Sequence, residues 1–202
     1  MGTGEGERRG RGRPRAPGAE QKILQAALEE YTEHGWSGFT MDGVARRSGF
    51  GKSTLYLRWT DKDALLTEAV RRRSRQVADV DTGTLRGDLT ALVTGIFRES
   101  ADPQGWAGFR MIVETASSSS ALGNFTQEAA SAPRGVLAAV FERARERGEI
   151  RGAVDPIPVS ELIHGAAILF VLGRRLDHLP ITGDELGTRV DWVVTTLLEG
   201  LG

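Results

Sequence analysis

The chain has 202 residues, a net charge of −1 at pH 7, and 40% hydrophobic and 26% charged residues, values typical of a soluble globular protein with one large or two small domains. It has no cysteine, which excludes disulfides, a thiol nucleophile and a cysteine-ligated zinc site and suits a reducing cytoplasm. The longest apolar run, Ala166–Leu172, is far below the ~20 residues of a membrane span, and no hydrophobic segment follows the basic N-terminus, so we expect neither a membrane partner nor a secretory signal.

Charge is distributed unevenly along the chain. Residues 1–78 hold 15 Lys and Arg against 10 Asp and Glu, a balance of +5, whereas residues 79–202 hold 11 against 17, a balance of −6. A basic end joined to an acidic end is typical of a nucleic-acid module followed by a module with another task. Chance asymmetry is the alternative explanation.

The first segment, residues 1–18, consists mainly of Gly, Arg, Pro and Glu and includes RRGRGRPR, Arg8–Arg15. It has no apolar periodicity, so we expect a disordered basic arm. Three roles stay open for it: a solvated tail, a nonspecific charge arm, or a segment shaped to lie in a DNA groove.

From residue 19 onward nearly every segment has the pattern of a helix. The first helix has an amphipathic stripe, which consists of Ile23, Leu24, Ala27, Leu28 and Tyr31. Gly35 is placed to end this helix. A second helix begins after Thr40, a good N-cap, and ends near Ser48-Gly49. A third spans residues 51–59, and Thr60 or Asp61 caps a fourth that extends to about Asp79.

Five later helices are expected, at about 85–100, 104–116, 122–147, 158–174 and 184–200. Proline- and glycine-containing breaks and a run of four serines separate them. No alternating apolar and polar run is long enough for a strand. The predicted fold is therefore all-α, with about nine helices.

The segment Thr40–Leu65 carries the most specific pattern in the chain. Two short helices are joined at Gly49, which takes the positive φ of a tight turn without a Cβ clash. Phe50, Leu55 and Trp59 give the second helix an apolar side. This is the helix-turn-helix pattern, whose second helix enters a major groove, and an ordinary helical hairpin is the structural alternative.

The outward residues of that second helix favour DNA binding. They carry hydroxyl and cationic groups, which are suited to phosphates and base edges, and they are Lys52, Ser53, Thr54, Tyr56 and Arg58. Lys52 and Lys62 lie near helix N-termini, where a cation opposes the helix dipole unless a bound phosphate shares the free N–H groups.

The stretch Ile23–Val70, ILQAALEEYTEHGWSGFTMDGVARRSGFGKSTLYLRWTDKDALLTEAV, resembles the N-terminal DNA-binding region of the TetR family of bacterial transcriptional repressors. It agrees without gaps and includes the core G-x-x-K-x-T-x-Y-x-x-[WF]-x-x-K. Glu146–Pro156, ERGEIRGAVDP, with the two apolar helices after it, resembles the C-terminal half of many members more loosely. The resemblance implies a homodimer in which residues 19–66 bind double-stranded DNA and residues 67–202 hold an effector pocket and the dimer interface.

The resemblance also implies roles for single residues. Positions that usually touch phosphates are matched by Thr40, Tyr56 and Lys62. Recognition-helix positions that usually face bases are matched by Lys52, Ser53, Thr54 and Leu57, with Arg58 beside them. The chain departs from the pattern at Gly43, where members commonly have a larger residue, and at Leu57, often aromatic or polar. An apolar Leu57 can contact only a thymine methyl or a base face.

In the N-terminal arm, Arg11-Gly12-Arg13-Pro14 resembles the R-G-R-P core of AT-hook peptides. Such peptides lie extended in a narrow A·T minor groove, where arginines find enhanced negative potential. Arg11 and Arg13 are thus candidate DNA contacts, and a nonspecific electrostatic tail stays the alternative.

Large apolar residues of the C-terminal half are mostly core, and a few are expected to line the cavity that the resemblance implies. Our candidates are Trp106, Phe109, Met111, Phe125, Phe141 and His164. Little in this set favours a strongly charged ligand, so we expect a largely apolar or aromatic small molecule. Glu161 and His164 form an E-x-x-H pair, but a di-iron site needs two such motifs and the chain has only three histidines. We expect no metal or other cofactor and a hydrogen-bonded pocket or core histidine.

Residues 158–172 and 184–201 carry more apolar residues than one helix face needs. We expect them to form a four-helix dimer contact through Leu162, Ala166, Leu169, Val190, Val194 and Leu197, with burial inside one subunit as the alternative. The resulting hypothesis is a cytoplasmic, ligand-responsive repressor that binds a near-palindromic operator. An activator or an effector-independent regulator is the first alternative, and a helical-bundle enzyme of the di-iron kind is disfavoured by the missing second motif.

Overall fold

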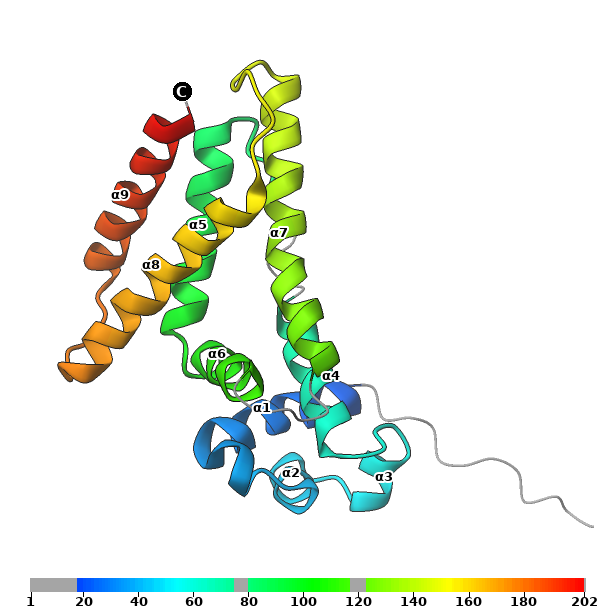
Figure 1. Cartoon of the computed structure of the whole chain (residues 1–202). Helices are drawn as coiled ribbons and strands as arrows, with labels where there is room; N and C mark the ends of the chain where they lie inside the picture. Colours follow the sequence, from blue (N-terminus) through cyan, green and yellow to red (C-terminus); the bar gives the residue numbers. More distant parts are fainter. Residues whose placement is uncertain (1–17, 75–79, 117–122, 202) are drawn as a thin grey trace, which may run out of the picture.

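The computed structural model describes residues 18–74, 80–116 and 123–201, and every regular element within them is a helix. The helices are α1 (Ala19–Gly38), α2 (Met41–Ser48), α3 (Lys52–Tyr56), α4 (Lys62–Ser74), α5 (Leu85–Ala101), α6 (Pro103–Ala116), α7 (Gly123–Glu146), α8 (Pro156–Leu176) and α9 (Gly183–Leu201). The predicted all-α fold with about nine helices is confirmed for these ranges (Figure 1).

Helix boundaries differ from the sequence-based expectation in α1 and α3. Gly35 takes φ 63° and breaks α1 as expected, but a further turn continues to Gly38. The third helix ends at Tyr56 instead of residue 59, although the Trp59 N–H still donates to the Leu55 carbonyl at 3.0 Å. The expected end of the fourth helix near Asp79 lies outside the described residues.

The N-terminal helices and α6 share one hydrophobic core, in the lower part of Figure 1. The amphipathic stripe of α1 packs against α2, α4 and α6. Leu65, Leu66 and Ala69 of α4 are all buried in this core, together with Ala107 and Met111 of α6. The packing therefore continues across the expected domain border at residues 66 and 67, and α6 packs directly on the N-terminal helices.

The second core is formed by α5, α7, α8 and α9. Helix α5 lies in the middle, with α8 crossing it and α9 beside it (Figure 1). Its Leu89, Val93 and Phe97 are almost fully buried, as a helix with neighbours on several sides requires.

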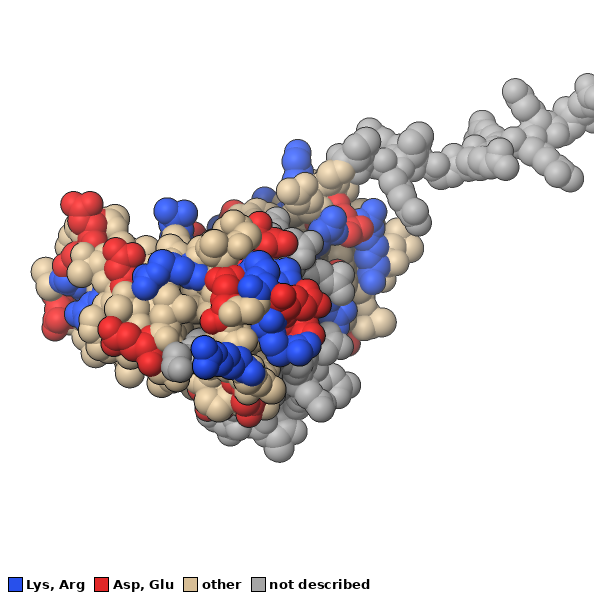
Figure 2. All heavy atoms as spheres, turned by 90° about the horizontal axis from the view of Figure 1, so that it is seen from above, with Lys and Arg blue, Asp and Glu red and all other residues tan. Residues whose placement is uncertain are grey.

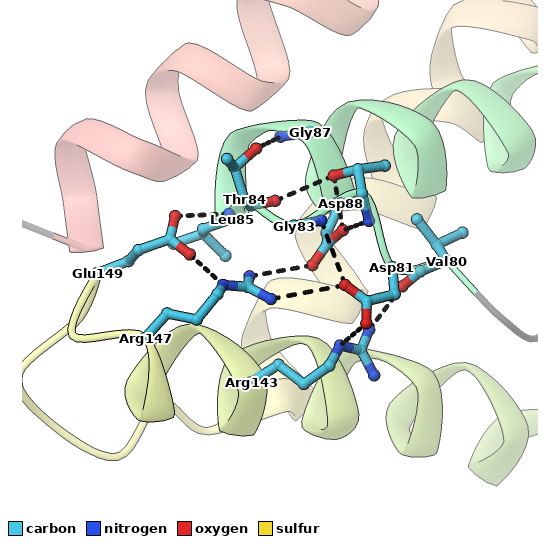
Figure 3. Close-up of polar contacts among 11 residues, drawn as sticks. Val80, Asp81, Gly83, Thr84, Leu85, Gly87, Asp88, Arg143, Arg147 and Glu149 are labelled. Atoms are coloured by element: carbon cyan, nitrogen blue, oxygen red, sulfur yellow. Dashed lines mark hydrogen bonds and ion pairs between the residues drawn. The ribbon is translucent and has the colours of Figure 1, made fainter.

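A polar network ties the loop before α5 to the end of α7 (Figure 3). The Asp88 carboxylate is fully buried and accepts hydrogen bonds from the Thr82 N–H (2.6 Å), the Thr82 hydroxyl (2.8 Å) and Arg147 Nη2 (3.2 Å). Arg147 also pairs with Glu149, which accepts the Leu85 N–H at 2.6 Å. The network thus satisfies a buried charge and one free N–H at the start of α5.

Acid should weaken this network. Burial alone raises the pKa of Asp88, but hydrogen bonds from Thr82 and Arg147 outweigh burial and hold that pKa below its usual value. The bond from the Leu85 N–H and the pairing with Arg147 also lower the pKa of Glu149. A carboxyl with a depressed folded-state pKa contributes stability above its unfolded pKa of about 4, and this contribution is lost as pH falls through the folded value.

We therefore expect the free energy of unfolding to decline below about pH 4, and to decline less in Asp88→Asn than in the parent chain. Urea unfolding at pH 7 and at several acidic values measures this difference. Equal declines in the two proteins would contradict the assignment.

Candidate nucleic-acid interface

The helix-turn-helix geometry arises from local residue choices. The Thr40 hydroxyl accepts the Gly43 N–H at 3.0 Å and so caps α2. Gly49 takes φ 75° at the C-terminal end of α2, and its N–H donates to the Ala45 carbonyl at 3.1 Å. Leu55 is fully buried beneath α3. These contacts fix α3 across the end of α2, the arrangement that presents a recognition helix.

The outer side of α3 and the residues after it form one exposed face. The predicted base-facing residues lie together there, with Thr54 half-buried and the rest exposed: Lys52, Ser53, Thr54, Leu57 and Arg58. Leu57 is 85% exposed. A large apolar side chain held so fully in water suits a residue that contacts a thymine methyl.

The three predicted phosphate contacts lie around one groove of about 430 Å³ beside this face. Thr40, Tyr56 and Lys62 line it, together with the carboxylates Asp42 and Asp61. Residues from α2, α3 and α4 are thus brought together although they are far apart in the sequence.

Lys62 has a second role that the sequence did not show. Its Nζ donates to the carbonyls of Trp36 (3.4 Å) and Phe39 (3.3 Å) and lies 4.1 Å from the centre of the Trp36 ring. The ammonium group therefore stabilises the C-terminal end of α1, where a cation is favourable. Lys62 begins α4 as expected, although its ammonium group reaches the end of α1, and phosphate contact by Lys62 stays a prediction.

Two carboxylates hold the cations of the exposed face. Lys52 Nζ lies 2.6 Å from Asp42, and Arg58 Nη1 lies 2.9 Å from Glu20. Glu20 also pairs with Arg72 of α4. DNA phosphates must compete with these carboxylates, because each cation is paired before DNA arrives.

Replacing Glu20 by Gln should strengthen DNA binding about threefold and steepen its salt dependence, since Arg58 and Arg72 become available for phosphates. Fluorescence anisotropy on a short duplex over a range of salt concentrations measures both quantities. Glu146→Gln, at the end of α7, changes the net charge equally and serves as the control. Equal effects of the two variants would contradict a local role for Glu20.

The unusual Gly43 is explained by a buried carboxylate. A Cβ at Gly43 would lie 1.8 Å from Glu30 Oε1. Glu30 is only 3% exposed and accepts from Arg47 Nε at 3.1 Å. Glu30 and Arg47 were missed in the sequence, although Glu30 follows Ile23 by seven residues and therefore lies on the buried stripe of α1.

The other end of the molecule lacks a field of one sign. Figure 2 views the molecule from the end opposite to α2 and α3 and shows acidic and basic side chains interspersed. Arg11 and Arg13 lie outside the described residues, so their minor-groove contact stays a prediction.

The six candidate effector residues do not gather in one place. Trp106 and Phe109 of α6 lie with ring centroids 5.4 Å apart. Met111 is buried in the first core and Phe141 in the second. The half-buried His164 donates from Nδ1 to the Ser160 carbonyl at 2.8 Å. The Phe125 side chain lies outside the described residues, and no group of three possible metal ligands occurs in the described part of the chain.

The expected dimer residues divide into two groups. Leu162 and Leu169 of α8 are 63% and 68% exposed. Val190, Val194 and Leu197 of α9 are buried in the subunit's own core, and Ala166 is half-buried. Of these six expected residues, only Leu162 and Leu169 present a large apolar area to a partner.

The sequence matches known families and relatives along most of its length. Residues 23–69 match the family described as bacterial regulatory proteins, tetR family, and residues 79–191 match the tetracyclin repressor-like C-terminal domain. An uncharacterised HTH-type transcriptional regulator of Mycobacterium tuberculosis is 30% identical over 87% of this chain and 85% of its own. The DNA-binding transcriptional repressor TetR of Mycobacteroides abscessus is 28% identical over 88% of this chain and 92% of its own.

Solved structures share the fold. A TetR-family regulator from Rhodococcus sp. has a TM-score of 0.73 at 18% identity, covering 91% of this chain and 98% of its own. FadR of Bacillus subtilis, solved in complex with stearoyl-CoA, has a TM-score of 0.70 at 18% identity, covering 90% and 99%.

Proposed function

The chain belongs to the TetR family of bacterial transcriptional regulators, and from this premise we propose that it is a cytoplasmic repressor that binds a near-palindromic operator as a homodimer and is released by a small molecule. The observation that carries the DNA-binding part is the groove shared by Thr40, Tyr56 and Lys62 beside the exposed face of α3. Repression is supported by the relative from Mycobacteroides abscessus, which is named a DNA-binding transcriptional repressor.

On DNA, α3 enters the major groove while the side groove receives a phosphate. Lys52, Ser53 and Thr54 face base edges at the start of α3, and Leu57 contacts a thymine methyl. In a two-fold dimer the two copies of α3 lie about 34–36 Å apart, one turn of the double helix. The operator consequently consists of two similar half-sites.

The dimer is supported by an uncovered apolar face on α8. Leu162, Leu169 and Leu176 recur at intervals of seven residues and are each at least 63% exposed. An 18-residue window of α8 has a mean hydropathy of 1.6, but only 28% of it is buried within the subunit. By length and composition alone this helix is apolar enough to cross a membrane. In a DNA-binding regulator, α8 of a second subunit is the occupant that covers such a face.

Leu169→Asp should convert the dimer into monomers and weaken operator binding, because it places a charge on a desolvated face. Sedimentation velocity at micromolar protein concentration measures the change, and Leu169→Met should stay dimeric. A dimeric Leu169→Asp variant would contradict the use of this face.

Two contacts couple the C-terminal helices to the DNA-binding unit. Arg73 of α4 donates to Glu99 (2.6 and 3.0 Å), Asp102 (2.8 Å) and Gln104 (2.7 Å) around the corner between α5 and α6. The Tyr31 hydroxyl of α1 donates to Glu114 of α6 at 2.8 Å. A ligand that prefers another position of α6 would move α4 and change the spacing of the two α3 helices, to the extent of its differential affinity.

Of the six candidate effector residues, Trp106 and Phe109 lie together on α6, and we propose these two as ligand contacts. They lie close to the Arg73 corner in the sequence, so a ligand at α6 acts directly on the coupling element.

A gel-shift assay on the DNA upstream of the protein's own gene tests the function. We expect sequence-selective binding that competitor DNA of unrelated sequence does not remove, and a reporter downstream of the bound site should be silenced. Absence of selective binding would overturn the proposal, and stimulation of the reporter would replace repressor by activator.

A further inference from the structure

A second groove, of about 490 Å³, lies far from the α3 face. The C-terminal ends of α5 and α8 and the loop into α9 form it, through Arg98, Ala101, Arg174, Arg175, Leu179, Ile181, Thr182, Gly183 and Leu186. The candidate effector residues do not line it. Its volume lies within the range of small-molecule sites.

The groove is strongly cationic. Arginines supply every ionisable lining residue that the structure describes there. Arg98 is exposed and has no ion-pair partner among the described residues. Arg174 pairs with Glu185, and the Arg175 guanidinium lies 4.9 Å from the centre of the Trp106 ring. Arg175 keeps its full charge in that contact, because an aromatic ring orients a cation without neutralising it.

The backbone adds to the positive potential. Helix α9 begins at Gly183 and runs for 19 residues, so its free N–H groups and its positive dipole end lie at the groove. The Thr182 hydroxyl accepts the Glu185 N–H at 3.3 Å and satisfies one of these groups. Asp184 and Glu185 lie in the first turn of α9 and offset part of this positive end, so Arg98 and Arg175 supply the main positive charge for an anion.

The remaining lining is apolar. Ala101, Leu179, Ile181 and Leu186 supply it, and Leu179 is 49% exposed. Inorganic phosphate alone would leave these side chains in water. An anion that carries an apolar body covers them and pairs with the guanidinium groups at once.

We propose that this groove binds an amphipathic organic anion, with its carboxylate or phosphate held by Arg98 and Arg175 and its apolar body against Leu179, Ile181 and Leu186. The proposal deepens the function proposed above, on which its regulatory meaning rests, by naming the ligand class. It differs from the sequence-based expectation of a ligand without strong charge.

The groove is also placed to transmit binding. Ala101 lines it, and the next residue, Asp102, accepts hydrogen bonds from Arg73 of α4. A ligand that draws the end of α5 toward α8 consequently acts on the same corner that holds α4.

Calorimetric titration of the full-length protein with octanoate at pH 7 tests the site. We expect octanoate to bind at least about tenfold more tightly than 1-octanol or inorganic phosphate, because each lacks one half of the interaction. Octyl phosphate distinguishes the two head groups, and tight binding of either octyl anion supports the site. If neither octanoate nor octyl phosphate binds more tightly than both 1-octanol and inorganic phosphate, the assignment is overturned.

Variants locate the bound anion. Arg98→Ala and Arg175→Ala should each weaken octanoate binding about tenfold, and Arg98→Lys should recover part of the loss. Arg86→Ala, near the other end of α5, is the matched control. Unchanged binding by Arg98→Ala and Arg175→Ala would overturn the assignment.

This titration involves no DNA, so its outcome is independent of the gel-shift test. Octanoate binding with unchanged operator affinity would support the site and contradict only its regulatory role.

Discussion

Replacement of Asp88 by Ala is expected to lower the free energy of unfolding by about 2–4 kcal/mol. The carboxylate is fully buried and receives two hydrogen bonds from Thr82 and one from Arg147. Without the carboxylate, the Thr82 N–H loses this hydrogen-bond acceptor and Arg147 loses its buried ion-pair partner. The loop that leads into α5 then loses its main attachment to the second core.

Chemical denaturation at pH 7 measures this loss, with Asp81→Ala as the control. Asp81 is exposed and also contacts Arg147, at 3.6 Å, as well as Arg143 at 3.9 Å. Exposed pairs contribute about 0–1 kcal/mol. If both variants unfold with the same free energy, burial of Asp88 has no special weight in the fold.

The double substitution Lys52→Ala/Tyr56→Ala is expected to weaken operator binding about 100-fold or more and to flatten its salt dependence. Lys52 lies on the exposed side of α3, which we propose to face base edges, and Tyr56 lines the groove proposed for a phosphate. Both side chains are exposed, and Lys52 pairs only with Asp42 among the described residues. The fold should therefore tolerate their loss.

Anisotropy titration against a salt series measures both effects, with circular dichroism to verify folding. Lys62 is left unchanged, since it holds the end of α1 and its loss would destabilise the unit that is being tested. Arg86→Ala removes one positive charge at a distance and should leave operator affinity unaltered. An unaltered affinity in the double variant would exclude α3 as the DNA-binding element.

Local patterns predicted the helices and the exposed side of α3 well. Thr40 and Gly49 act on their own neighbours in the chain, so residue type and spacing were enough to place the ends of α2. The same holds for the exposed residues of α3, because a short helix with Leu55 buried presents its other side to water.

Contacts between distant segments were not predictable in this way. Arg73 meets Glu99 and Asp102 only because α4 ends beside the corner of α5 and α6. The periodicity of apolar residues predicts that Met111 and Phe141 are buried, but it does not predict in which core each residue lies. Met111 lies in the first core and Phe141 in the second. The cationic groove likewise joins Arg98 to Arg175, residues that belong to different helices.

The contact between Glu30 and Gly43 has a consequence for engineering new operator specificity. A recognition segment transplanted from another regulator would bring a side chain to position 43, and Glu30 of the recipient already occupies that space. The smallest portable unit therefore runs from α1 through α3, with positions 30, 43 and 47 exchanged as a set. A chimera that exchanges only α2 and α3 would have a steric clash between position 43 and Glu30 in its folded state, even without DNA.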